Sequence, residues 1–378
     1  MTMKKSLIAL AVSSAVVAPA SVQAAEVYGS LNTTFESTST DNGGVGALIY
    51  NTTDDEAGLG MSDTLESRFG VSGSEDLGNG LTAGYTFEFG IGTTTGVTGG
   101  SANEDSNVNT RLSNVSLSGD FGTVKLGTMW GVLYEYAGWN HYRTDGHGGA
   151  THYFMTNGVG FLTADDPSGL RVDNTVAYTY GGGGYSSDPF TFTVALRSKD
   201  NDGAANTFGS GGYAANDDEA IDNVTIGAQG TFGDFTVNGT FYSESNSDTA
   251  AGASTADPSM ITLGGRWSSG PFYVGGTYFM ADRDQQTASA VGDDPSAFNI
   301  LGGMDFGSGY SGYLGVGAGD NDANNSDAGD MTTFFLQAQK EFSSRTKIYG
   351  EFETVEVDGG NASDPEQNTL AFGVKHSF

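Results

Sequence analysis

The chain has 378 residues, with 46 acidic and 15 basic side chains and a formal net charge of −31 at pH 7. This balance excludes a general nucleic-acid binder, because no basic footprint for phosphates exists. Cysteine is absent from the sequence, which excludes disulfides, thiolate metal sites and cysteine nucleophiles. Aromatic residues make up 11% and glycine occurs 59 times, so the composition favours short strands with glycine-rich turns over disorder.

The first 24 residues have the features of a secretory signal peptide. Lys4 and Lys5 supply the charged start, and the apolar segment 7–18 is too short to span a bilayer. Small residues precede a cleavage point after Ala24, and an uncleaved anchor is the alternative. We therefore expect a signal peptide at 1–24 and a single domain at 25–378.

From Glu26 onward, apolar residues alternate with polar ones, as in strands with one apolar face. Tight turns and long polar loops then follow one another in strict alternation. The tight turns are predicted at 74–80, 119–122, 181–189, 232–235, 268–271, 306–309 and 343–345. The long loops are predicted near 37–62, 91–108, 131–168, 199–220, 244–258, 282–296, 320–330 and 357–366.

These fifteen connections join 16 strands and predict an all-β fold, a 16-stranded antiparallel transmembrane β-barrel. A soluble sandwich does not need connections of alternating length, and a propeller would show a blade motif near every 40 residues. The polar alternate face suits a water-filled lumen, which a barrel of this size can enclose.

The third long loop, about 131–168, differs from the others in composition. It combines aromatic residues, charges and three of the four histidines, and it shows no sustained period of 2 or 3.6. A long insert without secondary structure is often functional. We expect it to fold into the bore, with Trp130, Tyr134, Tyr136 and Trp139 anchoring it to the wall.

Several segments together resemble the general bacterial porins. They are VYGSL near the start, ESRFGVSGSEDLGNGL at 66–81, TRLSNVSLSGDFGTVKLG at 110–127, WGVLYEYAGW at 130–139 and the closing VKHSF. The resemblance covers the chain from residue 25 and implies a homotrimeric channel in the outer membrane of a Gram-negative bacterium. Its surroundings would be lipid and lipopolysaccharide, and small hydrophilic solutes and ions would diffuse through it.

The resemblance also implies a constriction in which loop acids face a ladder of wall arginines. By motif the basic side is Arg68, Arg111 and Arg171. Strand parity supports Arg68 and Arg171 as facing the lumen. Arg111 shares its parity with apolar residues, so only the motif places it there.

On the loop side, Asp145 and Glu135 are the acidic candidates, and His141 stands where the family pattern has an acid. The resemblance further makes Phe378 the signal read by the barrel-assembly machinery. It makes the 91–108 loop, with Glu104 and Asp105, the latch onto a neighbouring subunit.

No enzyme motif is present, and the histidine spacing fits no zinc signature, so we expect neither catalysis nor a metal or cofactor. Acidic clusters in the outer loops, at 54–56, 217–219, 293–294 and 320–322, could hold Ca²⁺ or Mg²⁺, although a solvated surface explains them equally. The excess of acidic over basic residues predicts that the channel passes cations slightly more readily than anions. The alternatives are a solute-specific channel and a barrel acting as a surface adhesin or receptor.

Overall fold

The computed structural model describes most of the chain from residue 25 onward. The described residues are 25–42, 58–62, 67–93, 108–140, 146–158, 170–184, 186–198, 207–208, 211–212, 221–244, 258–282, 292, 294–322, 329–360 and 363–378. The predicted signal peptide lies outside them.

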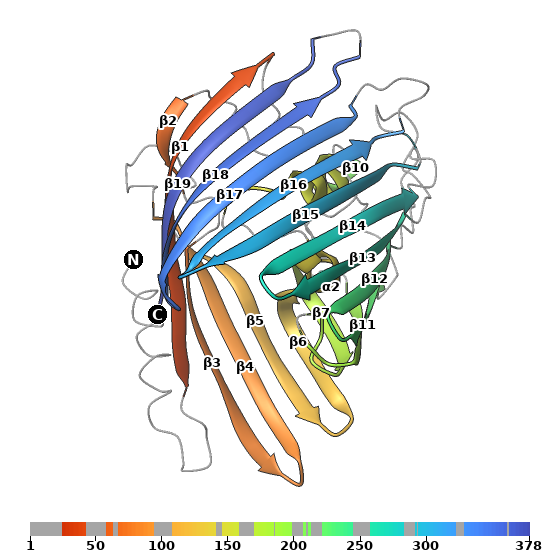
Figure 1. Ribbon diagram of the computed structural model, residues 1–378. Helices are drawn as coiled ribbons and strands as arrows, with labels where there is room; N and C mark the ends of the chain where they lie inside the picture. The colour runs from red at the N-terminus through yellow and green to blue at the C-terminus, as the bar shows by residue number, and fades with distance from the viewer. Residues whose placement is uncertain are drawn as a thin grey trace, which may run out of the picture.

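The strands form one antiparallel sheet that closes on itself (Figure 1). Closure occurs where β1 pairs with β19 on one side and with β2 and β3 on the other. Because β2 and β3 follow one another along β1, they act as one strand, and the barrel has the 16 strands predicted. The strands are β1 Glu26–Asp41, β2 Gly58–Ser62, β3 Ser67–Gly78, β4 Leu81–Ile91, β5 Val108–Gly119, β6 Gly122–Trp130, β7 Arg171–Tyr180, β8 Phe190–Ser198, β11 Ile221–Phe232, β12 Phe235–Glu244, β13 Ser259–Ser269, β14 Phe272–Asp282, β15 Ser296–Gly307, β16 Tyr310–Asp320, β17 Met331–Ser343, β18 Thr346–Val357 and β19 Glu366–Ser377.

All seven predicted tight turns are present, and the strand ends that the long connections join lie at the opposite end of the barrel. The first long loop is shorter than predicted, because β1 continues to Asp41 and the next strand begins at Gly58. The sequence does not predict this part of β1, because both faces of the strand are hydrophilic there and no apolar–polar alternation is visible. A small hairpin of β9 Thr207–Phe208 and β10 Gly211–Gly212 lies within the 199–220 loop.

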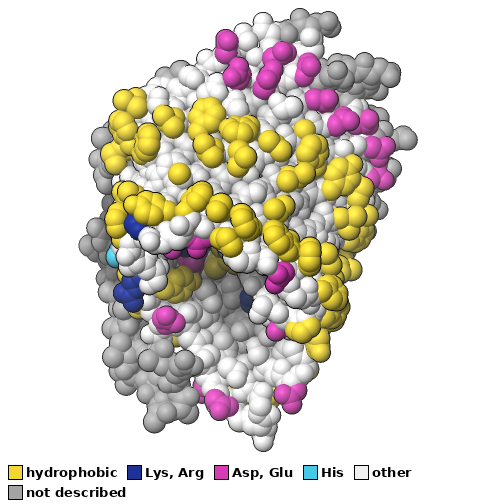
Figure 2. All heavy atoms as spheres, viewed as in Figure 1, with side chains coloured by type: hydrophobic (Ala, Val, Ile, Leu, Met, Phe, Trp, Pro, Cys, Tyr) yellow, Lys and Arg dark blue, Asp and Glu magenta, His cyan; other side chains and the backbone are white. Residues whose placement is uncertain are grey.

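The two faces of the wall differ as the alternation predicts. On β17, Phe334 and Leu336 point outward and are exposed, whereas Thr333 and Gln337 point inward and are buried. Figure 2 shows hydrophobic side chains gathered in bands over the outer face, with acidic side chains at the end where the long loops leave. An outward apolar belt and a polar interior are the inverse of a soluble core, and they suit a wall between hydrocarbon and water.

The third long connection contains helical segments, so the prediction that it lacks secondary structure is wrong. They are α2 Val132–Ala137, η2 Gly138–Asn140, α3 Ala150–Tyr153 and η3 Phe154–Gly158. Val132, Leu133, Tyr136 and Ala137 bury one face of α2 at the spacing of a helix, but six residues are too few to establish that period in the sequence. Among the described residues, no helix is long and apolar enough to cross a membrane.

Candidate pore constriction

Helix α2 lies against the inner wall, as expected of an inward-folded loop. Val132 and Tyr136 pack with Met129, Ala177 and Ala195, whose side chains face the interior. The Tyr136 hydroxyl lies 2.9 Å from the Thr193 hydroxyl on β8. An apolar contact and a buried hydrogen bond thus fix the start of the loop to β7 and β8.

The turn after α2 reaches across to the next part of the wall. The Asn140 side chain donates to Asn238 at 3.0 Å and to Thr277 at 3.1 Å, and the Tyr273 hydroxyl donates to the Asn140 carbonyl at 2.9 Å. Gly264 and Gly275 lie directly beneath, and a Cβ on either would meet Asn140. These two glycines therefore make room for the loop backbone against β13 and β14.

The second half of the loop is held by an apolar patch on the inner wall. Ala150, Phe154 and Met155 are fully or almost fully buried. They form one cluster with inward-facing wall residues that include Tyr242, Met260, Phe279, Ala281, Ala297, Met331, Val355 and Val357. Burying a side chain of this size contributes roughly 1.5–3 kcal/mol, so the loop is a fixed part of the barrel.

Two wall carboxylates on β18 bind the loop backbone between these two attachments. Glu351 accepts from the backbone N–H of Gly146 at 3.3 Å and of His147 at 3.0 Å, and Glu353 accepts from that of Gly148 at 2.9 Å. The Nδ1 of His147 also lies 2.9 Å from Glu351. Burial lowers the pKa of His147, but the hydrogen bond and charge of Glu351 and the charge of Glu353 outweigh it and raise the pKa to about 9.

The three predicted arginines all act electrostatically on one loop residue, Tyr134. Burial raises the pKa of the Tyr134 phenol to about 12, while Arg68, Arg111 and Arg171 each lower it. Arginines from β3, β5 and β7 thus lie close enough to act electrostatically on one side chain of α2.

Trp130 makes cation–π contacts with two of these arginines. The guanidinium carbons of Arg111 and Arg171 lie 5.7 Å and 5.9 Å from its ring centroid, and Tyr134 stacks on it at 5.2 Å. Each cation–π contact contributes about 0.5–2 kcal/mol. Such contacts hold like-charged groups near one another at the base of the loop.

A β-bulge explains why parity fails for Arg111. The register of β4 against β5 shifts between Glu88 and Phe89, so that Glu88 pairs with Leu112 while Phe89 pairs with Thr110. The register thus skips Arg111, whose side chain turns inward, where its Nε donates to Glu88 at 2.7 Å and both side chains are buried. Bulges are known to redirect a side chain in this way.

On β7 the expected parity holds at Thr175, which is buried, and at Val176, which is exposed, but it fails at Val172 near Arg171. The register of β6 against β7 shifts between Gly127 and Met129, and Asn174 has a φ of +46°. As a result Val172, which strict alternation with Arg171 would place on the outward face, packs against the inward cluster of Met129 and Tyr136. Arg171 pairs with Trp130 where the loop leaves the wall.

On the acidic side, only Glu135 falls within the described residues; Asp145 and His141 lie outside them. Burial raises the pKa of Glu135 to about 7, with Lys125 opposing the shift. Its side chain therefore lies near half ionisation at neutral pH.

The other predicted residues have separate locations. Phe378 exchanges backbone hydrogen bonds with Gly29 of β1, at 3.0 Å and 3.1 Å, where the first and last strands meet. Glu104 and Asp105 lie outside the described residues, as do the acidic clusters at 54–56 and 217–219. At 320–322 the backbone N–H of Asp322 donates to Asp320 at 2.8 Å, which is an ordinary turn contact.

Several lumen carboxylates were not predicted as site residues from the sequence. Glu88 pairs with Arg111, Asp173 accepts from Arg197 at 2.7 Å, and Glu351 and Glu353 bind the loop. Glu351 and Glu353 lie two residues apart and share the inward face of β18, with Phe352 between them on the outward face, and this alternation is the signal that could have located them.

A closed antiparallel barrel with an apolar outer belt and a loop fixed inside its bore defines a membrane-spanning channel protein. The profile of the Gram-negative porin family matches residues 6–360, and this chain belongs to that family. It is therefore an outer-membrane channel and not an enzyme.

Individual relatives agree with this assignment. The chain is 31% identical over 256 residues to outer membrane porin protein 32 of Delftia acidovorans, covering 61% of this chain and 67% of that protein. Among solved structures, an anion-selective porin from Comamonas acidovorans has 21% identity and a TM-score of 0.68 over 94% of this chain and 99% of that one. The trimer form of OmpT from Vibrio cholerae has 17% identity and a TM-score of 0.61, over 94% and 99% respectively. At these identities the two structures support the fold alone.

Proposed function

We propose that the chain forms a water-filled channel for passive diffusion of small hydrophilic solutes and ions, with a mild preference for cations. The observation that carries the preference is the pairing of lumen arginines with carboxylates. Arg111 is bound by Glu88 and Arg197 by Asp173. With these cations compensated, the excess of 46 acids over 15 bases sets the sign of the field that an entering ion meets.

The proposed constriction has Arg68, Arg111 and Arg171 on the wall and Glu135, His141 and Asp145 on the loop. Opposed charges across a narrow bore order water and favour small dipolar solutes over apolar ones. The convergence of the three arginines on Tyr134 supports this arrangement. Glu135 strengthens the acidic side as pH rises, because its pKa of about 7 leaves it partly protonated at neutral pH.

The proposed channel is a homotrimer that acts after removal of residues 1–24. The trimer form of the Vibrio cholerae OmpT structure supports this assembly. The loop at 91–108, with Glu104 and Asp105, is the proposed latch between subunits. Phe378 is the proposed signal for the barrel-assembly machinery, and its exposed ring at the chain end is compatible with that role.

The test is a planar-bilayer recording of the purified protein under a salt gradient. Closure in three equal steps and a reversal potential on the cation side are expected. Replacing Arg68, Arg111 and Arg171 together by Gln should increase the cation preference, whereas Arg266→Gln on β13 serves as the wall-charge control. Absence of conductance would overturn the diffusion channel and favour a plugged barrel with an adhesive or receptor role.

A channel with an anion preference is the second candidate, and one observation favours it. Three arginines act on Tyr134 where the loop meets the wall, so the narrowest region would carry a positive local field. The structural relative from Comamonas acidovorans is described as anion-selective. A reversal potential on the anion side, abolished by the triple Gln variant, would establish this candidate.

A further inference from the structure

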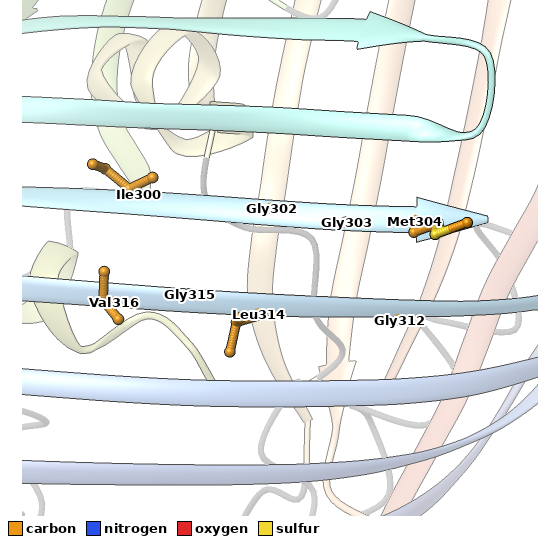
Figure 3. Close-up of a pocket in the computed structure, with 8 residues that line it drawn as sticks. All are labelled: Ile300, Gly302, Gly303, Met304, Gly312, Leu314, Gly315 and Val316. Atoms are coloured by element: carbon orange, nitrogen blue, oxygen red, sulfur yellow. The ribbon is translucent and has the colours of Figure 1, made fainter. Parts of the chain in front are cut away.

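The outer wall contains an apolar groove between β15 and β16 that is unrelated to the pore. Its volume is about 440 Å³. It is lined by Ile300, Gly302, Gly303, Met304, Gly312, Leu314, Gly315 and Val316. Figure 3 shows Ile300 and Met304 on β15 and Leu314 and Val316 on β16, with the labelled glycines between them.

The groove exists because glycine replaces a large side chain at two outward positions. Gly302 pairs with Leu314, and Gly312 pairs with Met304, so each glycine faces outward beside an apolar side chain of the next strand. A Cβ on Gly302 would meet no atom closer than 4.0 Å, the carbonyl oxygen of Tyr273. A larger side chain at residue 302 would therefore fit without a clash, and the outer wall is hollow here because that side chain is absent.

The surroundings of the groove indicate what fills it. Ile300, Leu314 and Val316 are about half exposed and belong to the outward apolar belt that faces hydrocarbon. The groove lies in the middle of this belt, with Phe298 beyond it on one side and Phe306 and Tyr310 beyond it toward the tight turn at Gly307–Tyr310. The tight-turn end is the periplasmic end of such a barrel. A lipid whose acyl chain extends into the groove from the tight-turn end belongs to the periplasmic leaflet.

The length of the groove matches one acyl chain. From Gly312 to Val316 the strand rises about 14 Å at ~3.4 Å per residue. One leaflet contributes about 15 Å of the roughly 30 Å hydrocarbon core. The groove is thus long enough to hold most of one extended chain of a membrane lipid.

A cation stands at the periplasmic end of the groove. Tyr310 pairs with Lys340 on β17, and the Lys340 Nζ lies 4.2 Å from the centroid of the Tyr310 ring. This Nζ also donates to the Ser308 carbonyl, and a lysine ammonium has three donors, so it can serve a further acceptor. Asp305, the carboxylate of the same turn, accepts from the backbone N–H of Gly307.

We propose that this groove binds one phospholipid of the periplasmic leaflet, with an acyl chain over Gly302 and Gly312 and the headgroup phosphate at Lys340. The apolar walls and the glycine floor match an acyl chain. The cation at the end of the groove matches the headgroup phosphate, so the features follow one another along the strand in the order of the parts of a phospholipid. The site rests on the membrane location of the barrel and is independent of its ion selectivity.

Native mass spectrometry of the purified protein with added phosphatidylglycerol tests the proposal. The parent protein should retain one lipid per protomer more tightly than any further lipid. Gly302→Leu, which fills the groove, should weaken that binding at least tenfold, and Lys340→Gln should weaken it several-fold. Gly350→Leu on the outward face of β18 is the matched control, because a Cβ there makes only ordinary contact with Phe372.

A second variant keeps the test decisive if Gly302→Leu fails to fold. Leu314→Ala removes one wall of the groove without adding bulk, and it should also weaken the first bound lipid. Unchanged binding in the folded Gly302→Leu or Leu314→Ala protein would overturn the proposal. Equal weakening of lipid binding by the control Gly350→Leu would also overturn it. The same holds if the first bound lipid is displaced by lipopolysaccharide but not by phosphatidylglycerol.

Discussion

The imidazole Nδ1 of His147 lies 2.9 Å from a carboxylate oxygen of Glu351, and the backbone N–H of the same histidine donates to that oxygen at 3.0 Å. One wall carboxylate thus binds both the main chain and the side chain of one loop residue. Hydrogen bonds to a carboxylate are roughly twice as strong as neutral ones. The position of the loop in the bore therefore depends on the ionisation of this pair.

Replacing Glu351 with Gln should loosen the loop. The substitution keeps the shape but removes the charge that holds three loop donors, and bonds to charged groups contribute about 1.5–3 kcal/mol each. Single-channel recordings should show greater open-channel current noise and a changed conductance, while the barrel still forms. Glu356→Gln, at an exposed position on the same strand, is the control. Identical noise in the two variants would contradict a role for Glu351 in fixing the loop.

The His147 pair also predicts a pH dependence. The pKa is raised from 6.5 to about 9 in the folded protein. A raised pKa stabilises the folded loop fully below pH 6.5, and this contribution is lost as pH rises through about 9. Current noise should therefore increase between pH 7 and 10, and His147→Gln should remove that step. A step that persists in the variant would assign the titration to another group.

The barrel could be predicted from the sequence because its signals are local and repeated. Alternation between Phe190 and Leu196, or between Phe235 and Phe241, reports which face meets hydrocarbon, and glycine-rich turns mark each reversal. Predictions failed where two faces are alike, as in β1 up to Asp41, or where a helix is too short to show a period, as in Val132–Ala137.

The candidate site was predicted less completely, for a physical reason. Parity cannot be read through a bulge, and the bulges beside Arg111 and Asn174 show only as register shifts between strands. The partners of the arginines and of the loop are likewise remote in sequence: Glu88 lies 23 residues from Arg111, and Glu351 lies 204 residues from His147. Motif resemblance located the arginines but carried no information about these carboxylates.

Removing the partner of Arg111 should alter selectivity. Glu88→Gln leaves a buried guanidinium without its carboxylate, and breaking such a pair costs about 3–5 kcal/mol. We expect a reversal potential shifted toward anions and a lower unfolding temperature. Asp173→Asn, which breaks the more exposed pair with Arg197, should produce a smaller loss of stability. A larger loss for Asp173→Asn would contradict the ranking of the two pairs by burial.

Glu135 should destabilise the barrel at alkaline pH. Its pKa is raised from 4.5 to about 7 by burial, so its stabilising contribution is full below pH 4.5 and is lost as pH rises through about 7. Glu135→Gln should accordingly raise stability at pH 8 by about 1–3 kcal/mol and leave it nearly unchanged at pH 4. Denaturant unfolding at the two pH values measures this difference. An equal effect at both values would show that ionisation of Glu135 is not the cause.

The seam between the first and last strands should be sensitive to the size of residue 29. A Cβ on Gly29 would lie 2.5 Å from the ring of Phe378 and 2.6 Å from the carbonyl oxygen of Arg68. Overpacking of this kind costs about 1–3 kcal/mol. Gly29→Ala should therefore lower the unfolding temperature and the yield of folded barrel.

The two obstacles can be separated with a double variant. Phe378→Ala removes the ring but leaves the Arg68 carbonyl, so adding it to Gly29→Ala should restore only part of the lost stability. Gly60→Ala on β2 is the control, because a Cβ there meets nothing within 4 Å. Full recovery in the double variant would show that only the ring limits residue 29. No recovery would show that the backbone of β3 alone requires glycine where the barrel closes.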